Sequence, residues 1–361
     1  MQKCNRRGSR RCLARLATVV VAIGTVGACD SALEVELPGN LVEEDLFQPE
    51  SAELLVNSAI ADFECSYSMF TVLTASMEDT WWRATGYWGN WAEYRQDRPG
   101  TAECATDDTN TGWAAGFQQS RFVAETAYEK ITEWGDEVSD SERLLATAAT
   151  YAGLVYQVLG ETYCELTVDT GPLMQPDEVL AVSEQWFSTA LDHMGNGDFE
   201  IVSTESLRQL ALLGRARVRL ALGDLAGATE DAAQISSDFV AHVTRDGSVR
   251  PRWNHVYRAL NVQGYSAIAD VVRWQGGPVE FTGYRDLTID PNGMPTIANG
   301  VPDPRVPVLY LNEFLQDGVT DNYAQQKYLS YDVPIPIARW AEAQLILAEI
   351  EGGAAAVGRL N

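Results

Sequence analysis

The chain has 361 residues, of which 51 are acidic and 26 are basic, giving a formal net charge of −25. Affinity for phosphate backbones comes from clustered lysine and arginine, so this surface repels polyanions and we expect no nucleic-acid partner. The apolar fraction of 46% is typical of a globular protein, and the length suffices for one large domain or two ordinary ones.

The N-terminal segment has the features of a bacterial lipoprotein signal. The first fifteen residues carry six basic side chains and no acidic one, and the apolar run Leu16–Val26 is too short for a permanent membrane-spanning helix. Small residues then lead into Cys29, as in signals whose cysteine is acylated. We therefore expect residues 1–28 to be a signal peptide and Cys29 to be lipidated, with membrane attachment through the lipid anchor only. The alternative is an ordinary cleaved signal with an incidental cysteine.

Residues 29–50 are acidic and lack apolar periodicity, which is typical of a tether. Beyond them, apolar residues recur at helical spacing in several long segments. The predicted helices run from Ser51 to about Met77, from Gly112 to Trp134, from a capping box at Ser139–Glu142 to Gly160, and from Pro176 to Met194.

The segment Leu207–Ile235 predicts a helical hairpin, because a glycine stop at Gly223 is followed at once by Asp224, a favourable N-cap. Small residues at Ala216, Gly223 and Ala228 would let two helices cross closely, at offsets similar to those of a tetratricopeptide repeat. A generic helix pair is the alternative, since no regular repeat runs along the chain.

Between Asp238 and Pro336, glycine and proline interrupt every periodic run, so the sequence predicts long loops that aromatic and aliphatic residues keep ordered. A further helix is predicted over Ile337–Glu351, apolar nearly all round and therefore buried. Its polar stripe consists of Arg339, Glu342 and Glu349, and we expect Arg339 to be paired with carboxylates or backbone carbonyls. Residues Ala354–Asn361 have the pattern of the start of another helix.

The strongest signal for ligand binding is an aromatic cluster, in which six of the fourteen residues from 81 to 94 are aromatic. Flat rings stack on the apolar faces of sugars, and polar side chains between them can orient the ligand. The candidate ligand-binding residues are Trp81, Trp82, Arg83, Tyr87, Trp88, Asn90, Trp91 and Tyr94, with Trp274 in a second cluster. The alternative is a small hydrophobic core in which these rings are buried.

The sequence lacks the common motifs of hydrolases, zinc proteases, phosphate-binding loops and dinucleotide folds. We therefore predict a non-enzymatic protein without a cofactor or a metal ion. Three cysteines follow the signal, Cys65, Cys104 and Cys164, and two of them could form a disulfide in an oxidising compartment. The sequence does not say which two.

Motifs in the C-terminal part resemble the SusD/RagB family of nutrient-uptake lipoproteins: Asp303–Arg305, Gln326–Tyr328, and Arg339–Glu342 running into Leu347–Glu349. The resemblance implies an all-α, SusD-like fold on a tetratricopeptide-like scaffold with long ordered loops, spanning residues 51–361. Because members of the family are commonly longer, we expect the chain to be truncated at its C-terminus.

The resemblance also implies an outer-membrane lipoprotein that lids a SusC-like TonB-dependent transporter and captures oligosaccharides or other nutrients for import. We expect its body at the cell surface, although the sequence does not distinguish this from the periplasmic face. Two alternatives stay open. An all-α glycosidase would need two carboxylates facing each other across a cleft, and a scaffold that binds only protein would bury the aromatic rings.

Overall fold

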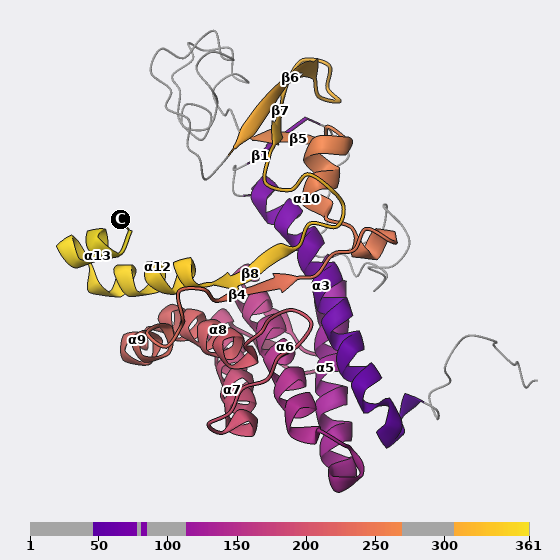
Figure 1. The fold of residues 1–361 in the computed structure, drawn as a ribbon, viewed down its shortest axis with the longest axis vertical. Coiled ribbons are helices and arrows are strands. Elements are labelled where there is room, and N and C mark those ends of the chain that lie inside the picture. Colours follow the sequence, from indigo (N-terminus) through magenta and orange to yellow (C-terminus); the bar gives the residue numbers. More distant parts are fainter. Residues whose placement is uncertain (1–45, 78–80, 85–112, 269–306, 361) are drawn as a thin grey trace, which may run out of the picture. The chain divides into compact units, whose positions relative to one another are not determined.

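The computed structural model describes residues 46–77, 81–84, 113–268 and 307–360 (Figure 1). The chain divides into two units, Met1–Gln48 and Pro49–Asn361, and every helix and strand named below lies in the second. The predicted signal peptide at residues 1–28, the lipidation site at Cys29 and most of the tether at residues 29–50 lie outside the described residues.

Long helices make up most of the second unit, whereas its strands are short and pair two by two. The helices are α3 (Ala52–Met77), α5 (Trp113–Trp134), α6 (Ser141–Thr162), α7 (Pro176–Met194), α8 (Leu207–Leu222), α9 (Leu225–Ala232), α10 (His255–Tyr257), α12 (Trp340–Glu351) and α13 (Gly353–Leu360), with the short turns η1 (Pro49–Ser51), η2 (Gly135–Glu137), η3 (Arg250–Arg252) and η4 (Arg258–Val262). The strands are β1 (Trp81–Arg83), β2 (Leu166–Thr167), β3 (Leu173–Met174), β4 (Val240–Val243), β5 (Ser266–Ile268), β6 (Val308–Phe314), β7 (Asp321–Gln325) and β8 (Ile335–Arg339). Antiparallel pairs join β1 to β5, β2 to β3, β4 to β8 and β6 to β7. Among the described helices, none combines the length and hydropathy needed to cross a membrane.

The core lies between α3, α5, α6, α7 and α8, in which each helix packs against the next along the chain (Figure 1). The α6 helix is central, because it contacts each of the other four and every residue from Leu144 to Gly160 is buried. Two of its buried hydroxyl groups bond within the helix, since Oγ1 of Thr150 donates to the carbonyl oxygen of Ala146 at 2.8 Å and Oγ1 of Thr147 donates to that of Arg143 at 2.7 Å. Threonine hydroxyl groups paired in this way can be enclosed at little cost.

Two glycines let an aromatic ring of α7 lie between its neighbours. A Cβ atom at Gly153 of α6 would stand 2.9 Å from the ring of Phe187, and one at Gly214 of α8 would stand 2.4 Å from it. The Phe187 side chain is fully buried. The close packing of these three helices therefore depends on the missing methyl groups.

Replacing Gly214 with alanine is expected to lower the free energy of unfolding by about 1–3 kcal/mol, because the added methyl group overlaps the Phe187 ring in a packed core. Urea denaturation at pH 7 measures the loss. The variant Phe187→Leu removes the atoms that clash, so the double variant should lose less than the sum of the two single variants. Gly358→Ala is the control, since nothing lies within 4 Å of a Cβ there. Additive losses would contradict the overlap.

The predicted hairpin over Leu207–Ile235 is confirmed as α8 followed by α9. Gly223 ends α8 in the left-handed region, with φ of +83°, where a side chain would be strained. Asp224 then caps α9, because its Oδ1 accepts a hydrogen bond from the backbone N–H of Gly227 at 3.0 Å.

The capping box predicted at Ser139–Glu142 is wrong. The α6 helix begins at Ser141, and Asp140 precedes it in the left-handed region with φ of 59° and no capping side-chain hydrogen bond. The Asp140 carboxylate accepts a hydrogen bond from Nε of Arg143 instead. The helix also continues past Gly160, where the glycine allows close packing against α7 rather than ending the helix.

Residues 238–336 contain strands, where the sequence predicted only loops. These strands are three to seven residues long, and register shifts interrupt both β4 and β6. Strands this short contain too few residues to show the alternation of apolar and polar side chains that marks a strand in a sequence. Each of them also pairs with a segment that is distant in sequence or with one across a bulge.

The helix predicted from Ile337 begins at Trp340, because the preceding residues extend β8. It is not buried all round, since Leu345 is 55% exposed. Arg339 is also exposed and forms no ion pair with a described residue, so its predicted pairing is wrong. Its neighbour on the predicted stripe, Glu342, pairs instead with Arg217 of α8.

The structure reduces the number of cysteine pairs that could form the disulfide. Cys65 of α3 is buried and disulfide-bonded, whereas Cys164 is an exposed free thiol. The partner of Cys65 therefore lies outside the described residues.

Candidate functional site

The structure describes where the predicted aromatic segment begins. Trp81–Arg83 form β1, and Trp81 lies opposite Ile268 of β5. Beyond the strand, the backbone N–H of Ala84 donates to the carbonyl oxygen of Tyr265 at 2.9 Å, and the Ala84 side chain is buried. Trp81 is half-buried, and β1 also contacts α3. The first residues of the segment are thus fixed to the segment Tyr265–Ile268 by backbone hydrogen bonds.

Most of the other predicted site residues are not described. Tyr87, Trp88, Asn90, Trp91, Tyr94 and Trp274 lie outside the described residues, and for Trp82 and Arg83 only the backbone is described. The two strands are antiparallel, so the chain leaves β1 towards residue 85 at one end of the pair and leaves β5 towards residue 269 at the other end. The ribbon that they form has three residue pairs, a length of about 7 Å. Segments that are far apart in sequence therefore leave from one small ribbon.

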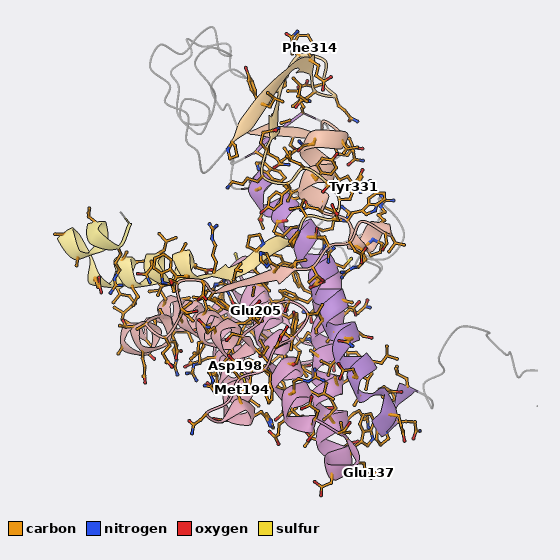
Figure 2. All side chains as sticks on the ribbon, viewed as in Figure 1. Glu137, Met194, Asp198, Glu205, Phe314 and Tyr331 are labelled. Atoms are coloured by element: carbon orange, nitrogen blue, oxygen red, sulfur yellow. The ribbon has the colours of Figure 1, made fainter. Side chains whose placement is uncertain are left out.

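A second group of aromatic side chains, which we call the Trp253 cluster, consists of Trp253, Tyr257 and Tyr331. The ring centroids of Trp253 and Tyr331 are 4.6 Å apart, and Tyr257 stands edge-on to Tyr331 at 5.1 Å. The guanidinium carbon of Arg258 lies 5.7 Å from the centre of the Trp253 ring. All three rings are half-buried, and Figure 2 shows Tyr331 beside α10. Partly open rings next to a cation suit a ligand that has both apolar faces and polar edges.

The sequence interpretation missed this cluster. Trp253 and Tyr257 are four residues apart, but Trp253 has an extended backbone and precedes the N-cap of α10, so helical spacing does not relate the two rings. Tyr331 comes from a distant segment that Asn254 holds in place, since its backbone N–H donates to the carbonyl oxygen of Tyr331 at 2.8 Å and its Nδ2 donates to that of Val333 at 2.7 Å. No local pattern could have linked these residues.

A buried ion network fixes the segment before the Trp253 cluster against α3. Glu64 of α3 is only 1% exposed. Its Oε2 accepts a hydrogen bond from Nη1 of Arg252 at 2.8 Å, and its Oε1 accepts one from the backbone N–H of Thr244 at 2.8 Å. The guanidinium of Arg245 is also buried and lies 3.4 Å from Glu64, and burial lowers the pKa of Arg245 to about 10. The Glu64 carboxylate thus binds two parts of the chain at once, one at Thr244 and one at Arg252.

His255 adds a buried titratable group to this region. The side chain is 5% exposed, and its Nδ1 has no hydrogen-bond partner among the described residues. Burial, reinforced by the positive charges of Arg258, Arg245 and Arg250, lowers the pKa of His255 to about 3. The imidazole is therefore neutral at pH 7.

No family model matches the sequence, and no curated protein matches it. Solved structures do match. A SusD superfamily protein from Bacteroides vulgatus is 13% identical with a TM-score of 0.55, over 87% of this chain and 79% of its own. A SusD-like carbohydrate binding protein from the same species is 12% identical with a TM-score of 0.53, over 87% and 74%. The chain has a SusD-like fold. A SusD-like protein from Bacteroides fragilis agrees, at 13% identity and a TM-score of 0.52 over 88% and 79%.

The predicted helical, SusD-like fold class is thereby confirmed, and SusD/RagB proteins are the structural neighbours across most of the chain. At 12–13% identity the likeness concerns the path of the backbone. This likeness does not identify the side chains of a binding site, which only the residues of this chain can indicate.

Proposed function

We propose that the chain is a SusD/RagB lipoprotein of the outer membrane that binds glycans on the aromatic segment from Trp81 to Tyr94. The observation that carries the proposal is a segment unusually rich in tryptophan, mounted on the β1–β5 ribbon of a SusD-like fold. One of the similar structures is a carbohydrate binding protein, which supports the same class of ligand.

The chemistry of the segment fits a sugar. Indole and phenol rings offer flat apolar faces for stacking on pyranose rings, and Arg83 and Asn90 can donate hydrogen bonds to hydroxyl groups. The Trp253 cluster supplies further half-open rings on the described surface. We infer that Trp274 belongs to the same binding region, because its segment leaves from the same ribbon.

The proposal includes the remaining expectations from the sequence. Cys29 would carry the lipid after removal of residues 1–28, the body would stand at the cell surface, and a SusC-like TonB-dependent transporter would take up the captured glycan. Capture without catalysis agrees with the absence of hydrolase motifs in the sequence. We therefore propose a binding protein rather than a glycosidase or a scaffold for protein alone.

Calorimetry against a panel of polysaccharides tests this function. The wild type is expected to bind at least one of them, and Trp88→Ala and Trp91→Ala are each expected to weaken that binding about 3- to 10-fold, because each removes one stacking surface. Trp340→Ala is the matched control, since Trp340 is a partly exposed tryptophan on α12. Unchanged affinity in both tryptophan variants would refute the assignment of the binding site to the aromatic segment. Release of reducing sugar by the wild type would favour the glycosidase.

A further inference from the structure

The described part of the chain contains a cavity of about 1360 Å³, and its described lining includes no residue of the Trp253 cluster. Its walls come from α3, α6, α8, β4, β8 and α12, together with residues 327–334. Pockets for small ligands typically have about 300–1,000 Å³. The cavity is thus large enough for a ligand of several sugar rings.

One wall of the cavity is aromatic. Phe63, Tyr67 and Phe70 follow each other on one face of α3, with ring centroids 5.5 Å apart for the first pair and 5.9 Å for the second. Phe63 and Tyr67 are nearly parallel, at an angle of 28°. Tyr67 and Phe70 are only half-buried, so part of each ring is open. This wall offers the flat apolar surface on which a sugar ring stacks.

The wall formed by α6 carries a buried acceptor without a partner. Gln157 is 4% exposed and lines the cavity, and its Nε2 donates to Oε1 of Glu161 at 2.9 Å. Its Oε1 has no hydrogen-bond partner among the described residues. The hydroxyl groups of Tyr67 and Tyr328, which also line the cavity, make no hydrogen bond with the residues that the structure describes. A buried unpaired acceptor costs about 1–3 kcal/mol, which a hydroxyl group of a ligand would recover.

The charges around the cavity balance. Among the described residues, three acidic and three basic side chains line it: Glu161, Glu342, Glu349, Arg217, Lys327 and Arg339. Glu342 already accepts hydrogen bonds from Nε and Nη2 of Arg217, and Nη2 also donates to the carbonyl oxygen of Ile337 at 2.5 Å. His242 adds no charge at pH 7, because burial lowers its pKa. In a chain with a net charge of −25, this balance favours a neutral ligand over an ionic one.

We propose that this cavity is a second binding site, which takes a neutral, hydroxyl-rich ligand, a short oligosaccharide. The half-buried rings of Tyr67 and Phe70 would stack on the sugar, and Gln157, Tyr67 and Tyr328 would bond its hydroxyl groups. The class of ligand rests on the proposed function, whereas the location of the site rests on the cavity alone.

The test measures the number of sites by calorimetry and ligand-detected NMR, with malto-, cello- and laminarihexaose as probes. Ala221→Trp fills the cavity from α8, where Ala221 is exposed within the lining, and is expected to weaken binding at this site about tenfold or more. Gln157→Leu removes the unpaired acceptor and is expected to weaken it about tenfold. Ala226→Trp is the matched control, since Ala226 is an exposed alanine on α9 outside the lining. Urea denaturation verifies that each variant is folded.

The double variant Trp88→Ala/Trp91→Ala, which we call the platform variant, distinguishes binding at the aromatic segment from binding in the cavity. Hexaose binding that survives in this variant and is lost in Ala221→Trp supports the cavity site. Binding that the platform variant abolishes and Ala221→Trp leaves unchanged overturns the cavity site and leaves the proposed function standing. If no hexaose binds the wild type while a peptide ligand is sensitive to Ala221→Trp, the cavity takes polypeptide and the inference is wrong.

Discussion

Replacing Glu64 with glutamine is expected to lower the free energy of unfolding by about 3–5 kcal/mol. The carboxylate is almost fully enclosed and faces the guanidinium groups of Arg245 and Arg252. Glutamine keeps the size of the side chain and removes the negative charge, so a buried cation loses the group that compensates it. The amide also offers one acceptor oxygen where the carboxylate offers two, and Thr244 bonds both of them. Urea denaturation at pH 7 measures the loss.

Glu53→Gln on the same helix is the matched control. Glu53 pairs with Nη2 of Arg143 at 2.6 Å, but its side chain is 55% exposed. Exposed ion pairs contribute about 0–1 kcal/mol, so this variant should unfold within about 1 kcal/mol of the wild type. Equal losses in the two variants would show that burial of Glu64 does not determine its contribution.

The Glu64 network also predicts an effect on binding. The loop that it fixes leads directly into Trp253 and α10. If the Trp253 cluster takes part in glycan binding, Glu64→Gln should bind the glycan more weakly than the wild type, even under conditions where the variant remains folded. Glu53→Gln again serves as the comparison, because it lies at the start of α3.

The helices could be predicted from the sequence because their signals are local. Apolar spacing predicted α7 with both of its ends, and Gly223 followed by Asp224 predicted the turn between α8 and α9. A helix satisfies its backbone within one segment, so the residues that decide it are all close in sequence. The start of α12 was misplaced because Ile337 and Ala338 have an apolar pattern that suits a helix as well as a strand.

The strands and ion pairs depend on partners that are distant in sequence. Three residues at Trp81 become a strand only because Ser266–Ile268 lie beside them. Likewise, Glu342 was assigned to a polar stripe with Arg339, whereas its partner is Arg217, 125 residues away. A charged side chain on a helical wheel shows that a partner is needed and does not show which one.

The candidate binding sites also differ in whether the sequence could reveal them. The composition of residues 81–94 shows where aromatic rings gather, and that prediction of a binding site stays open. The cavity was invisible in the sequence, because its lining combines residues of α3, α6 and α8 with segments beyond residue 327. Gln157 illustrates the difficulty: on the sequence it is one polar residue in an apolar helix, and only the packing shows that its oxygen is buried without a partner.

Acidification is expected to destabilise the protein through His255. The folded state holds its imidazole neutral, with the pKa lowered to about 3 by burial and by the charges of Arg258, Arg245 and Arg250. The unfolded chain protonates the same group below about pH 6.5. Protons therefore favour unfolding as the pH falls from about 6.5 to about 3, and the effect stops growing below pH 3, where both states are protonated.

Comparing urea midpoints at pH 7.0 and pH 4.5 isolates this contribution. The wild type should lose on the order of 2 kcal/mol through His255 over that interval, and His255→Gln should lose less by about that amount. Some acid sensitivity will remain in the variant, because burial also lowers the pKa of His242. His193→Gln is the control, since His193 lies near the surface and pairs with Glu142 at 2.8 Å. If His255→Gln loses as much stability on acidification as the wild type, the buried ring is protonated in the folded state, and a counter-charge must reach it despite the three arginines.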